Sequence, residues 1–118
     1  MIQLLNGDCL ELMQSIPDKS VDMVMCDLPY GTTACKWDSV IPLEPLWEQY
    51  KRICKGAIVL TAQPPFDKQL GASNLGALKY EWIWRKSRPS GHLNAKLQPM
   101  KEHENVLVFY EKQPTYNP

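Results

Sequence analysis

The sequence has no excess charge of either sign and no long apolar run. Its 13 Lys and Arg residues balance its 13 Asp and Glu residues, so any attraction to nucleic acid must come from a local basic patch. No stretch approaches the roughly 20 apolar residues that a membrane-spanning helix needs, and no signal-peptide pattern opens the chain. We therefore expect no membrane partner and a cytoplasmic location.

The sequence also lacks paired cysteines. Its four cysteines, at positions 9, 26, 35 and 54, form no C-x-x-C pair, so the spacing suggests neither a zinc site nor a disulfide framework. This predicts reduced thiols and no metal. With 118 residues, of which 44% are hydrophobic and 22% charged, the chain suits one globular domain with a modest core.

Short apolar runs alternate with amphipathic stretches along the chain, and this alternation predicts an α/β fold with a mostly parallel sheet. We expect strands at 2–5, 21–26, 57–61, 78–84 and 105–110, and helices at 10–16, 46–53 and 66–70. Asp8 is placed to cap the first helix, and Lys55-Gly56 is placed to end the second. The polar segment 85–101 is expected to be a loop.

The most informative stretch is the tetrapeptide Asp27-Leu28-Pro29-Tyr30, which follows the apolar run 21–26. This pattern is typical of a buried strand that ends at a rigid loop, and ligands bind at such strand ends in open α/β sheets. Pro29 favours an extended conformation at Leu28, so the direction of the Leu28 carbonyl is nearly fixed. A carboxylate, an oriented carbonyl and an aromatic ring therefore meet within four residues, and a simple turn has no need of this combination.

Asp27 to Thr33 resembles the catalytic Asp-Pro-Pro-Tyr motif of DNA amino-methyltransferases, which methylate adenine N6 or cytosine N4. The flanking segments resemble the permuted (β) group of that family, in which the catalytic half precedes the cofactor half, and they cover nearly the whole chain: Gly7 to Glu11, Pro17 to Asp22, Trp37-Asp38 and His103 to Phe109. The resemblance implies a Rossmann-like S-adenosylmethionine-dependent methyltransferase fold, with helices on the faces of the sheet and an antiparallel last strand.

The resemblance also implies roles for the tetrapeptide. The Asp27 carboxylate and the Leu28 carbonyl would accept the two N–H bonds of the target amine, and such preorganised partners stabilise developing charge. Tyr30 would stack on a base flipped out of double-stranded DNA. Leu28 replaces the family's usual Pro but keeps the carbonyl. Asp27 favours adenine N6, since cytosine-N4 enzymes usually have Ser there, and cytosine N4 stays an alternative.

Further binding residues follow from the same resemblance. Asp8 and Cys9, together with Asp27, would contact S-adenosylmethionine, although Asp8 has the alternative role of a helix cap only. The loop after the tetrapeptide carries Lys36 and Trp37, for which we expect DNA contact, with ordinary packing as the alternative for Trp37. Phosphate contacts are expected from the basic residues of 85–101, whose alternative is a solvated connection: Arg85, Lys86, Arg88 and Lys96.

One feature of the family is missing. The six glycines, at 7, 31, 56, 71, 76 and 91, form no Asp-Pro-Phe-x-Gly-x-Gly turn, which in the family lets the backbone approach the cofactor. We expect residues 1–118 to be the N-terminal catalytic part of the domain, without the target-recognition region and the cofactor half. The expected function is site-specific DNA adenine-N6 methylation, as in restriction-modification, in a homodimer or with a complementing chain. The alternative is an inactive remnant that serves as a DNA-binding or interaction module.

Overall fold

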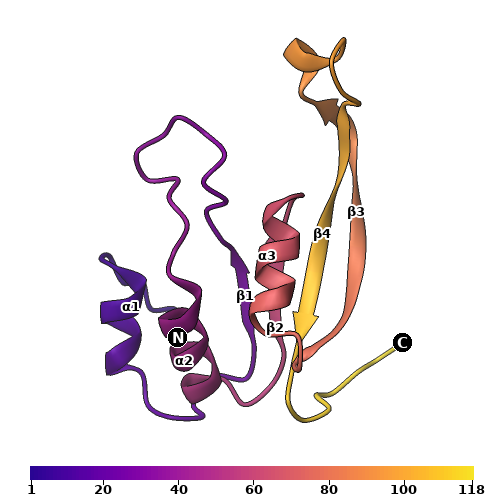
Figure 1. Ribbon diagram of the computed structural model, residues 1–118. Helices are drawn as coiled ribbons and strands as arrows, with labels where there is room; N and C mark the ends of the chain where they lie inside the picture. The colour runs from indigo at the N-terminus through magenta and orange to yellow at the C-terminus, as the bar shows by residue number, and fades with distance from the viewer.

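Four strands form a single mixed sheet in the order β1-β2-β4-β3 (Figure 1). In the computed structural model, which describes residues 1–118, β1 (Val24–Asp27) runs parallel to β2 (Ile58–Ala62). β4 (Lys101–Phe109) is antiparallel both to β2 and to β3 (Leu78–Ser90). The mixed α/β fold is confirmed. The sheet is only partly parallel, however, because the short β3–β4 connection forces an antiparallel hairpin.

The helices form where the apolar periodicity predicts them. They are α1 (Cys9–Leu12) with the 3-10 turn η1 (Met13–Ser15), then α2 (Leu43–Ile53) and α3 (Phe66–Ser73). One further 3-10 turn, η2 (His92–Asn94), lies in the segment expected to be a loop. The predicted face of α2 is buried, with Leu46, Trp47, Tyr50 and Ile53 between 0% and 6% exposed. None of these helices has the length and apolar character needed to cross a bilayer.

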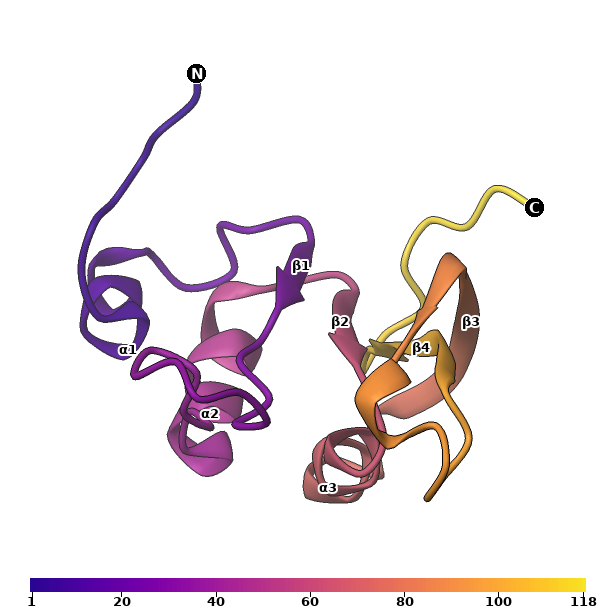
Figure 2. The ribbon, with the colours of Figure 1, turned by 90° about the horizontal axis from the view of Figure 1, so that it is seen from above.

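The core lies between one face of the sheet and the helices. Figure 2 shows α2 and α3 on the same side of the strands, and Trp47 Nε1 donates to Ser73 Oγ at 2.8 Å to join the two helices. The strands contribute Leu60 from β2 and Phe109 from β4, both fully buried. This single layer of helices positions the carboxyl ends of β1 and β2.

The opposite face of the sheet, which we call the open face, carries no helix. A row of residues crosses it in register, from Met25 through Val59 and Val108 to Tyr80. Its outer members are accessible: Met25 is 71% exposed, and Trp82, the next β3 residue on this face, is 53% exposed. The middle of the row is buried, with Val59 8% and Val108 2% exposed, so the open face is accessible mainly on the outer strands β1 and β3.

Two elements predicted from the sequence differ in the structure. The expected strand at 2–5 does not form, and its apolar side chains are 50% to 91% exposed. Figure 2 shows this segment running away from the sheet, and a strand without a neighbour cannot satisfy its backbone hydrogen bonds. The expected loop at 85–101 is shorter than predicted, because β3 continues to Ser90, and the connection to β4, which begins at Lys101, spans only 91–100.

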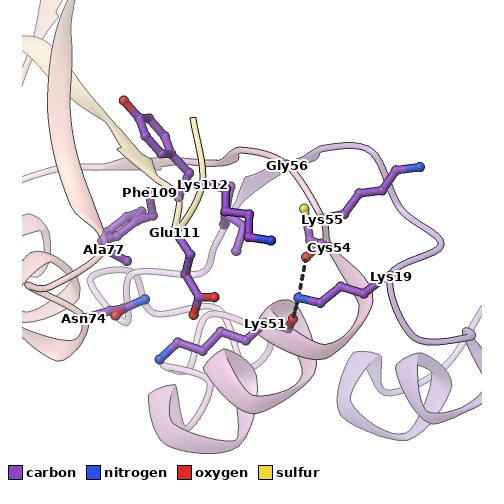
Figure 3. A pocket seen from close by; sticks show the side chains of 12 residues that line it. Lys19, Lys51, Cys54, Lys55, Gly56, Asn74, Ala77, Phe109, Glu111 and Lys112 are labelled. Carbon is purple, nitrogen blue, oxygen red and sulfur yellow. Dashed lines mark hydrogen bonds between the residues drawn. The ribbon is translucent and has the colours of Figure 1, made fainter. Parts of the chain in front are cut away.

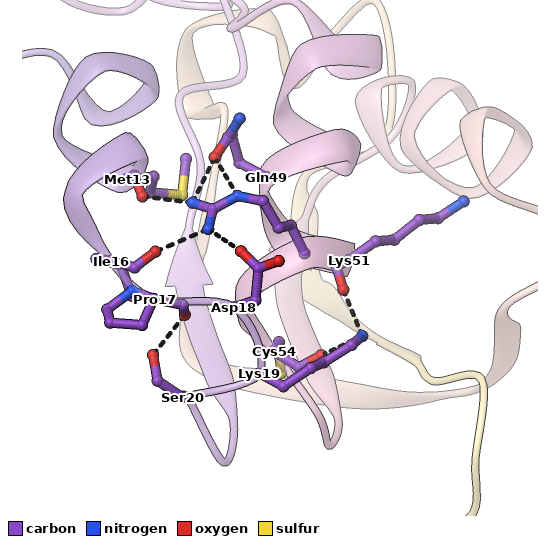
Figure 4. A network of polar contacts seen from close by, with 10 residues as sticks. Met13, Ile16, Pro17, Asp18, Lys19, Ser20, Gln49, Lys51 and Cys54 are labelled. Carbon is purple, nitrogen blue, oxygen red and sulfur yellow. Dashed lines mark hydrogen bonds and ion pairs between the residues drawn. The ribbon is translucent and has the colours of Figure 1, made fainter.

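Arg52 fastens the first helical segment to α2, and its partners Met13, Ile16, Asp18 and Gln49 are labelled in Figure 4. Its guanidinium donates to the carbonyl oxygens of Met13, at 2.7 Å, and Ile16, at 2.8 Å. It also pairs with Asp18 at 2.6 Å and donates to Gln49. The sequence patterns gave no sign of this cluster, since it joins residues that are more than 30 positions apart.

We expect Arg52→Met to lower the free energy of unfolding by about 2 kcal/mol, because several hydrogen bonds to one charged group are lost while most of the side-chain volume is kept. Urea denaturation followed by circular dichroism measures this change. Arg88→Met is the matched control, since Arg88 is exposed and has no ion-pair partner. Equal stability of the two variants would contradict the role assigned to Arg52.

Candidate functional site

The carboxyl ends of β1 and β2 bring Asp27 and Thr61 side by side, as in-register partners. Thr61 Oγ1 donates to Asp27 Oδ1 at 2.5 Å, and the Tyr30 hydroxyl lies 3.0 Å from the same oxygen. No protein hydrogen bond engages the other oxygen, Oδ2, and the carboxylate is exposed to solvent. Asp27 is thus a carboxylate fixed by one oxygen and free to accept with the other.

Tyr30 is held by both its ring and its hydroxyl. The ring stacks on Phe66, with 5.3 Å between centroids and 27° between planes. Burial, followed by the negative charges of Asp27 and Glu104, raises the pKa of the Tyr30 hydroxyl far above its usual value. Tyr30 therefore stays a neutral hydrogen-bond donor at physiological pH.

A pocket of about 430 Å³ opens in front of the tetrapeptide. All four tetrapeptide residues line it, together with Thr32, Thr33, Trp37 and Asp38. The Leu28 side chain is only 5% exposed and belongs to the core cluster, so it anchors the loop from below. A volume of this order suits a small organic ligand, and the structure brings the predicted catalytic residues to one hollow.

Asp38 orders the loop that forms this pocket. Its carboxylate accepts the backbone N–H groups of Gly31 at 3.0 Å, Thr32 at 3.1 Å and Thr33 at 2.7 Å, as well as the Thr33 hydroxyl at 2.7 Å. Gly31 has φ +71°, a left-handed conformation that favours glycine. The Thr33 hydroxyl, then the Gly31 and Thr33 amides, lower the pKa of Asp38 to about 2. Sequence reasoning missed this role, for which an Asp shortly after Gly-Thr-Thr is only a weak signal.

The Asp38 carboxylate should make the stability of this loop depend on pH in the acidic range. Because its pKa in the folded chain lies below the ordinary value of 3.8, its contribution is complete above about pH 4 and is lost as the pH falls to about 2. We expect the stability difference between wild type and Asp38→Asn to shrink over that window, as measured by urea denaturation at each pH. Asp22→Asn is the control. A difference that is unchanged down to pH 2 would contradict the assignment.

Glu104, at the start of β4, also reaches the site. Its Oε2 lies 3.4 Å from the Tyr30 hydroxyl, and its Oε1 accepts from Gln63 Nε2 at 2.8 Å. Lys86 Nζ pairs with the same Oε1 at 2.5 Å. Sequence reasoning noted His103-Glu104 as a family feature without a role, and the structure joins Glu104 to three segments of the chain.

The predicted cofactor residues lie near the start of α1. Asp8 Oδ1 accepts from the backbone N–H groups of Leu10 at 2.8 Å and Glu11 at 3.4 Å, which confirms its role as a helix cap. Partial burial and the neighbouring Asp8 and Cys26 raise the pKa of the Cys9 thiol. Cys26 lies in β1, directly before Asp27, and its effect on Cys9 indicates that the start of α1 lies close to this strand. A cofactor role for Asp8 and Cys9 stays a prediction.

The predicted DNA-contacting residues fall into different environments. Arg85 pairs with Glu102 at 3.1 Å, and Lys86 pairs with Glu104. Arg88 and Lys96 are exposed and have no ion-pair partner. Lys36 is exposed, and Trp37, 74% exposed at the pocket, is not packed in the core. Figure 1 shows that the loop after β1 and the tip of the β3–β4 hairpin project in the same direction.

A second hollow, of about 420 Å³, lies near the amino end of β2 (Figure 3). Four lysines line it: Lys19, Lys51, Lys55 and Lys112. Two of these are already engaged, since Lys19 Nζ donates to the carbonyl oxygens of Lys51 and Cys54, and Lys55 pairs with Asp22. None of the residues predicted to act in catalysis, cofactor binding or DNA binding lines this hollow.

Comparisons with solved structures identify the fold. The PvuII DNA methyltransferase, which is cytosine-N4-specific, matches 92% of this chain with a TM-score of 0.71 and 14% identity, over 49% of its own length. M1.HpyAVI, solved with SAM, matches 98% of this chain with a TM-score of 0.71 and 19% identity, over 56% of its length. A candidate DNA modification methylase from Thermus thermophilus matches 95% with a TM-score of 0.61 and 19% identity, over 53% of its length.

The chain has the fold of these methyltransferase structures. It spans about half the length of each. No protein-family model matches the sequence, and no curated protein matches it. At 14% to 19% identity, the comparison establishes the architecture, and the chemistry must be argued from the site.

Proposed function

We propose that this chain is the catalytic half of an S-adenosylmethionine-dependent DNA methyltransferase that acts on adenine N6. The observation that carries the proposal is the Asp27 carboxylate at the end of β1, with Oδ1 held by Thr61 and Tyr30 and with Oδ2 free. The Leu28 carbonyl, next to it, accepts none of the loop or side-chain hydrogen bonds. Two acceptors are therefore available at one pocket.

These acceptors suit an exocyclic amine. The lone pair of such an amine is delocalised into the base, and attack on a methyl group requires it to be localised on nitrogen. Hydrogen bonds from the two N–H groups to Asp27 Oδ2 and the Leu28 carbonyl favour a pyramidal nitrogen and stabilise its developing positive charge. The new N–CH3 bond forms as the S–CH3 bond breaks, and the nitrogen then loses one proton. S-adenosylmethionine, when bound, supplies the activated methyl group.

The residues present would hold one side of that cofactor. Asp8 is exposed beside α1 and keeps Oδ2 free of hydrogen bonds, and Cys9 lies near β1. No glycine turn faces them from the other side. We infer that a further segment, on the same polypeptide, on a complementing chain or in a homodimer, completes the site and covers the open face. Flipping of the target base out of double-stranded DNA follows from the need to reach the pocket.

We assign phosphate contacts to three exposed cations on the loop after β1 and on the β3–β4 hairpin: Lys36, Arg88 and Lys96. Arg85 would contribute if it exchanged its partner Glu102 for a phosphate. Trp37, exposed at the pocket, would contact the flipped base or its neighbours.

Two other functions have specific support. The second candidate function, after methylation of adenine N6, is methylation of cytosine N4, because the PvuII enzyme with this fold is cytosine-N4-specific. The third is a non-catalytic DNA-binding or interaction module, because these 118 residues contain no glycine turn of the kind expected to approach the cofactor. Transfer of labelled methyl from S-adenosylmethionine to DNA, by the chain alone and with the segment that completes the domain, separates enzyme from module. DNA binding without any transfer by the completed protein would overturn the proposal.

A further inference from the structure

We propose that Glu104 and Lys86 together are positioning residues that direct the Tyr30 hydroxyl onto Asp27, and so couple the β3–β4 hairpin to the site. This inference rests on the proposed function for its catalytic consequence. Its structural content, the hydrogen-bond partner of Tyr30, stands independently of that function.

Glu104 is more buried than a surface ion pair requires. Its side chain is 12% exposed and that of Lys86 is 22% exposed. A carboxylate removed from water to this extent needs charged and hydrogen-bonding partners, and it finds them on three different segments: Lys86 in β3, Gln63 after β2 and Tyr30 after β1. Glu104 therefore joins β4 to β3 and to the segments that follow β1 and β2.

A neighbouring pair shows what simple cross-strand stabilisation looks like. Arg85 and Glu102 join the same two strands at 3.1 Å, but their side chains are 81% and 53% exposed. They contact no residue of the pocket. Exposed pairs of this kind contribute little to stability. Glu104 differs because its side chain lies on the same face of the sheet as Thr61 and Asp27, and because its second oxygen points to Tyr30.

The Tyr30 hydroxyl has one proton and three oxygen atoms within reach. Asp27 Oδ1 lies at 3.0 Å, Thr61 Oγ1 at 3.1 Å and Glu104 Oε2 at 3.4 Å. Thr61 donates its own proton to Asp27 Oδ1, so Tyr30 is directed to the Asp27 side of the site when it bonds to either of the first two, and Glu104 is the competing charge. Lys86 and Gln63 both donate to Glu104, and these bonds make it the weaker competitor for the Tyr30 proton. With Lys86 in place, Tyr30 donates to Asp27 and fixes the carboxylate that would accept the target amine. This gives Lys86 a role at the site instead of the phosphate contact predicted from the sequence.

The assignment predicts an ordered set of effects. Lys86→Met leaves Glu104 charged and less well paired, so it should pull the Tyr30 hydroxyl away from Asp27 and lower kcat of the completed enzyme on the order of 10²-fold, the loss typical of a misplaced reacting group. Adding Glu104→Gln to Lys86→Met should restore much of that loss, because the competing charge is gone. A merely structural pair would give no such recovery. Glu102→Gln, the same substitution two residues away, is the matched control and should leave kcat unchanged.

A second measurement does not depend on catalysis. In the chain with 13C-labelled tyrosine, the Cζ resonance of Tyr30 reports the partner of its hydroxyl. We expect this resonance to move in Lys86→Met, to return towards its wild-type position in the double variant, and to stay in place in Glu102→Gln. Tyr30→Phe identifies the resonance and should remove most of the kinetic difference between Lys86→Met and the double variant.

Each outcome decides a separate question. If the completed protein transfers no methyl group, the proposed function fails and the Tyr30 resonance alone tests the positioning role. If the resonance is the same in wild type and Lys86→Met, the positioning role is overturned, whatever the activity. If the resonance moves but kcat does not, the coupling to catalysis is overturned.

Discussion

Asp27→Ala should abolish methyl transfer by the completed enzyme while the fold survives. The variant removes an acceptor aimed at developing charge, and the loss of one such partner typically costs about 10²–10³ in rate. The fold should tolerate the change because Asp27 is exposed and water can replace it as the acceptor for Thr61 and Tyr30. Methyl-transfer kinetics and thermal unfolding, measured on the same preparation, check both parts.

Asp22→Ala is the control for this experiment. Asp22 lies just before β1, its side chain is 87% exposed, and its one ion pair is with Lys55, at the other end of the strand from the pocket. We expect this variant to keep wild-type turnover. Near wild-type turnover in Asp27→Ala as well would show that the catalytic assignment is wrong.

The second large effect concerns the chain by itself, which should bind S-adenosylmethionine weakly or undetectably and should associate with itself. The residues that it contributes reach only one side of the cofactor, and an incomplete site leaves water at the reacting atoms. The open face exposes Met25 and Trp82, and β1 has an unpaired edge, so both the surface and the edge favour association. Sedimentation and calorimetric titration of the purified chain measure the two properties.

A pair of variants tests where the association occurs. Trp82→Lys places a charge on the open face and should shift the chain towards monomer. Leu93→Lys is the control, because Leu93 is 87% exposed at the hairpin tip, away from that face. A wild-type chain that is a stable monomer and binds the cofactor at micromolar affinity would contradict the half-site account.

Local patterns in the sequence predict much of this architecture. The apolar face of α2 and the Asp8 cap depend on residues within one or two helical turns, so periodicity and capping preference are sufficient. The position of the tetrapeptide at a strand end is predicted for a similar reason, since an apolar run followed by Pro and Gly marks the end of a strand. The strand is predicted to be buried, but β1 lies at the edge of the sheet and Met25 is 71% exposed. The residues predicted for catalysis meet at one pocket, although their roles stay predictions.

Other features depend on contacts that no local pattern encodes. The segment 2–5 has a strand's composition but no neighbour to pair with, and the second half of the β3–β4 hairpin is so exposed on both faces that its strands carry no apolar alternation. Glu104 and Asp38 acquire their roles from hydrogen bonds to other segments or to loop amides. The stacking role predicted for Tyr30 needs only its ring, and the contacts of its hydroxyl with Asp27 and Glu104 add a second role.

The identity of the methylated base tests the central claim most directly. DNA treated with the completed enzyme and S-adenosylmethionine would be digested to nucleosides and analysed by mass spectrometry, with the Asp27→Ala variant treated in parallel. The account predicts N6-methyladenine with the wild type and none with the variant. N4-methylcytosine in its place, or equal methylation by both proteins, would contradict it.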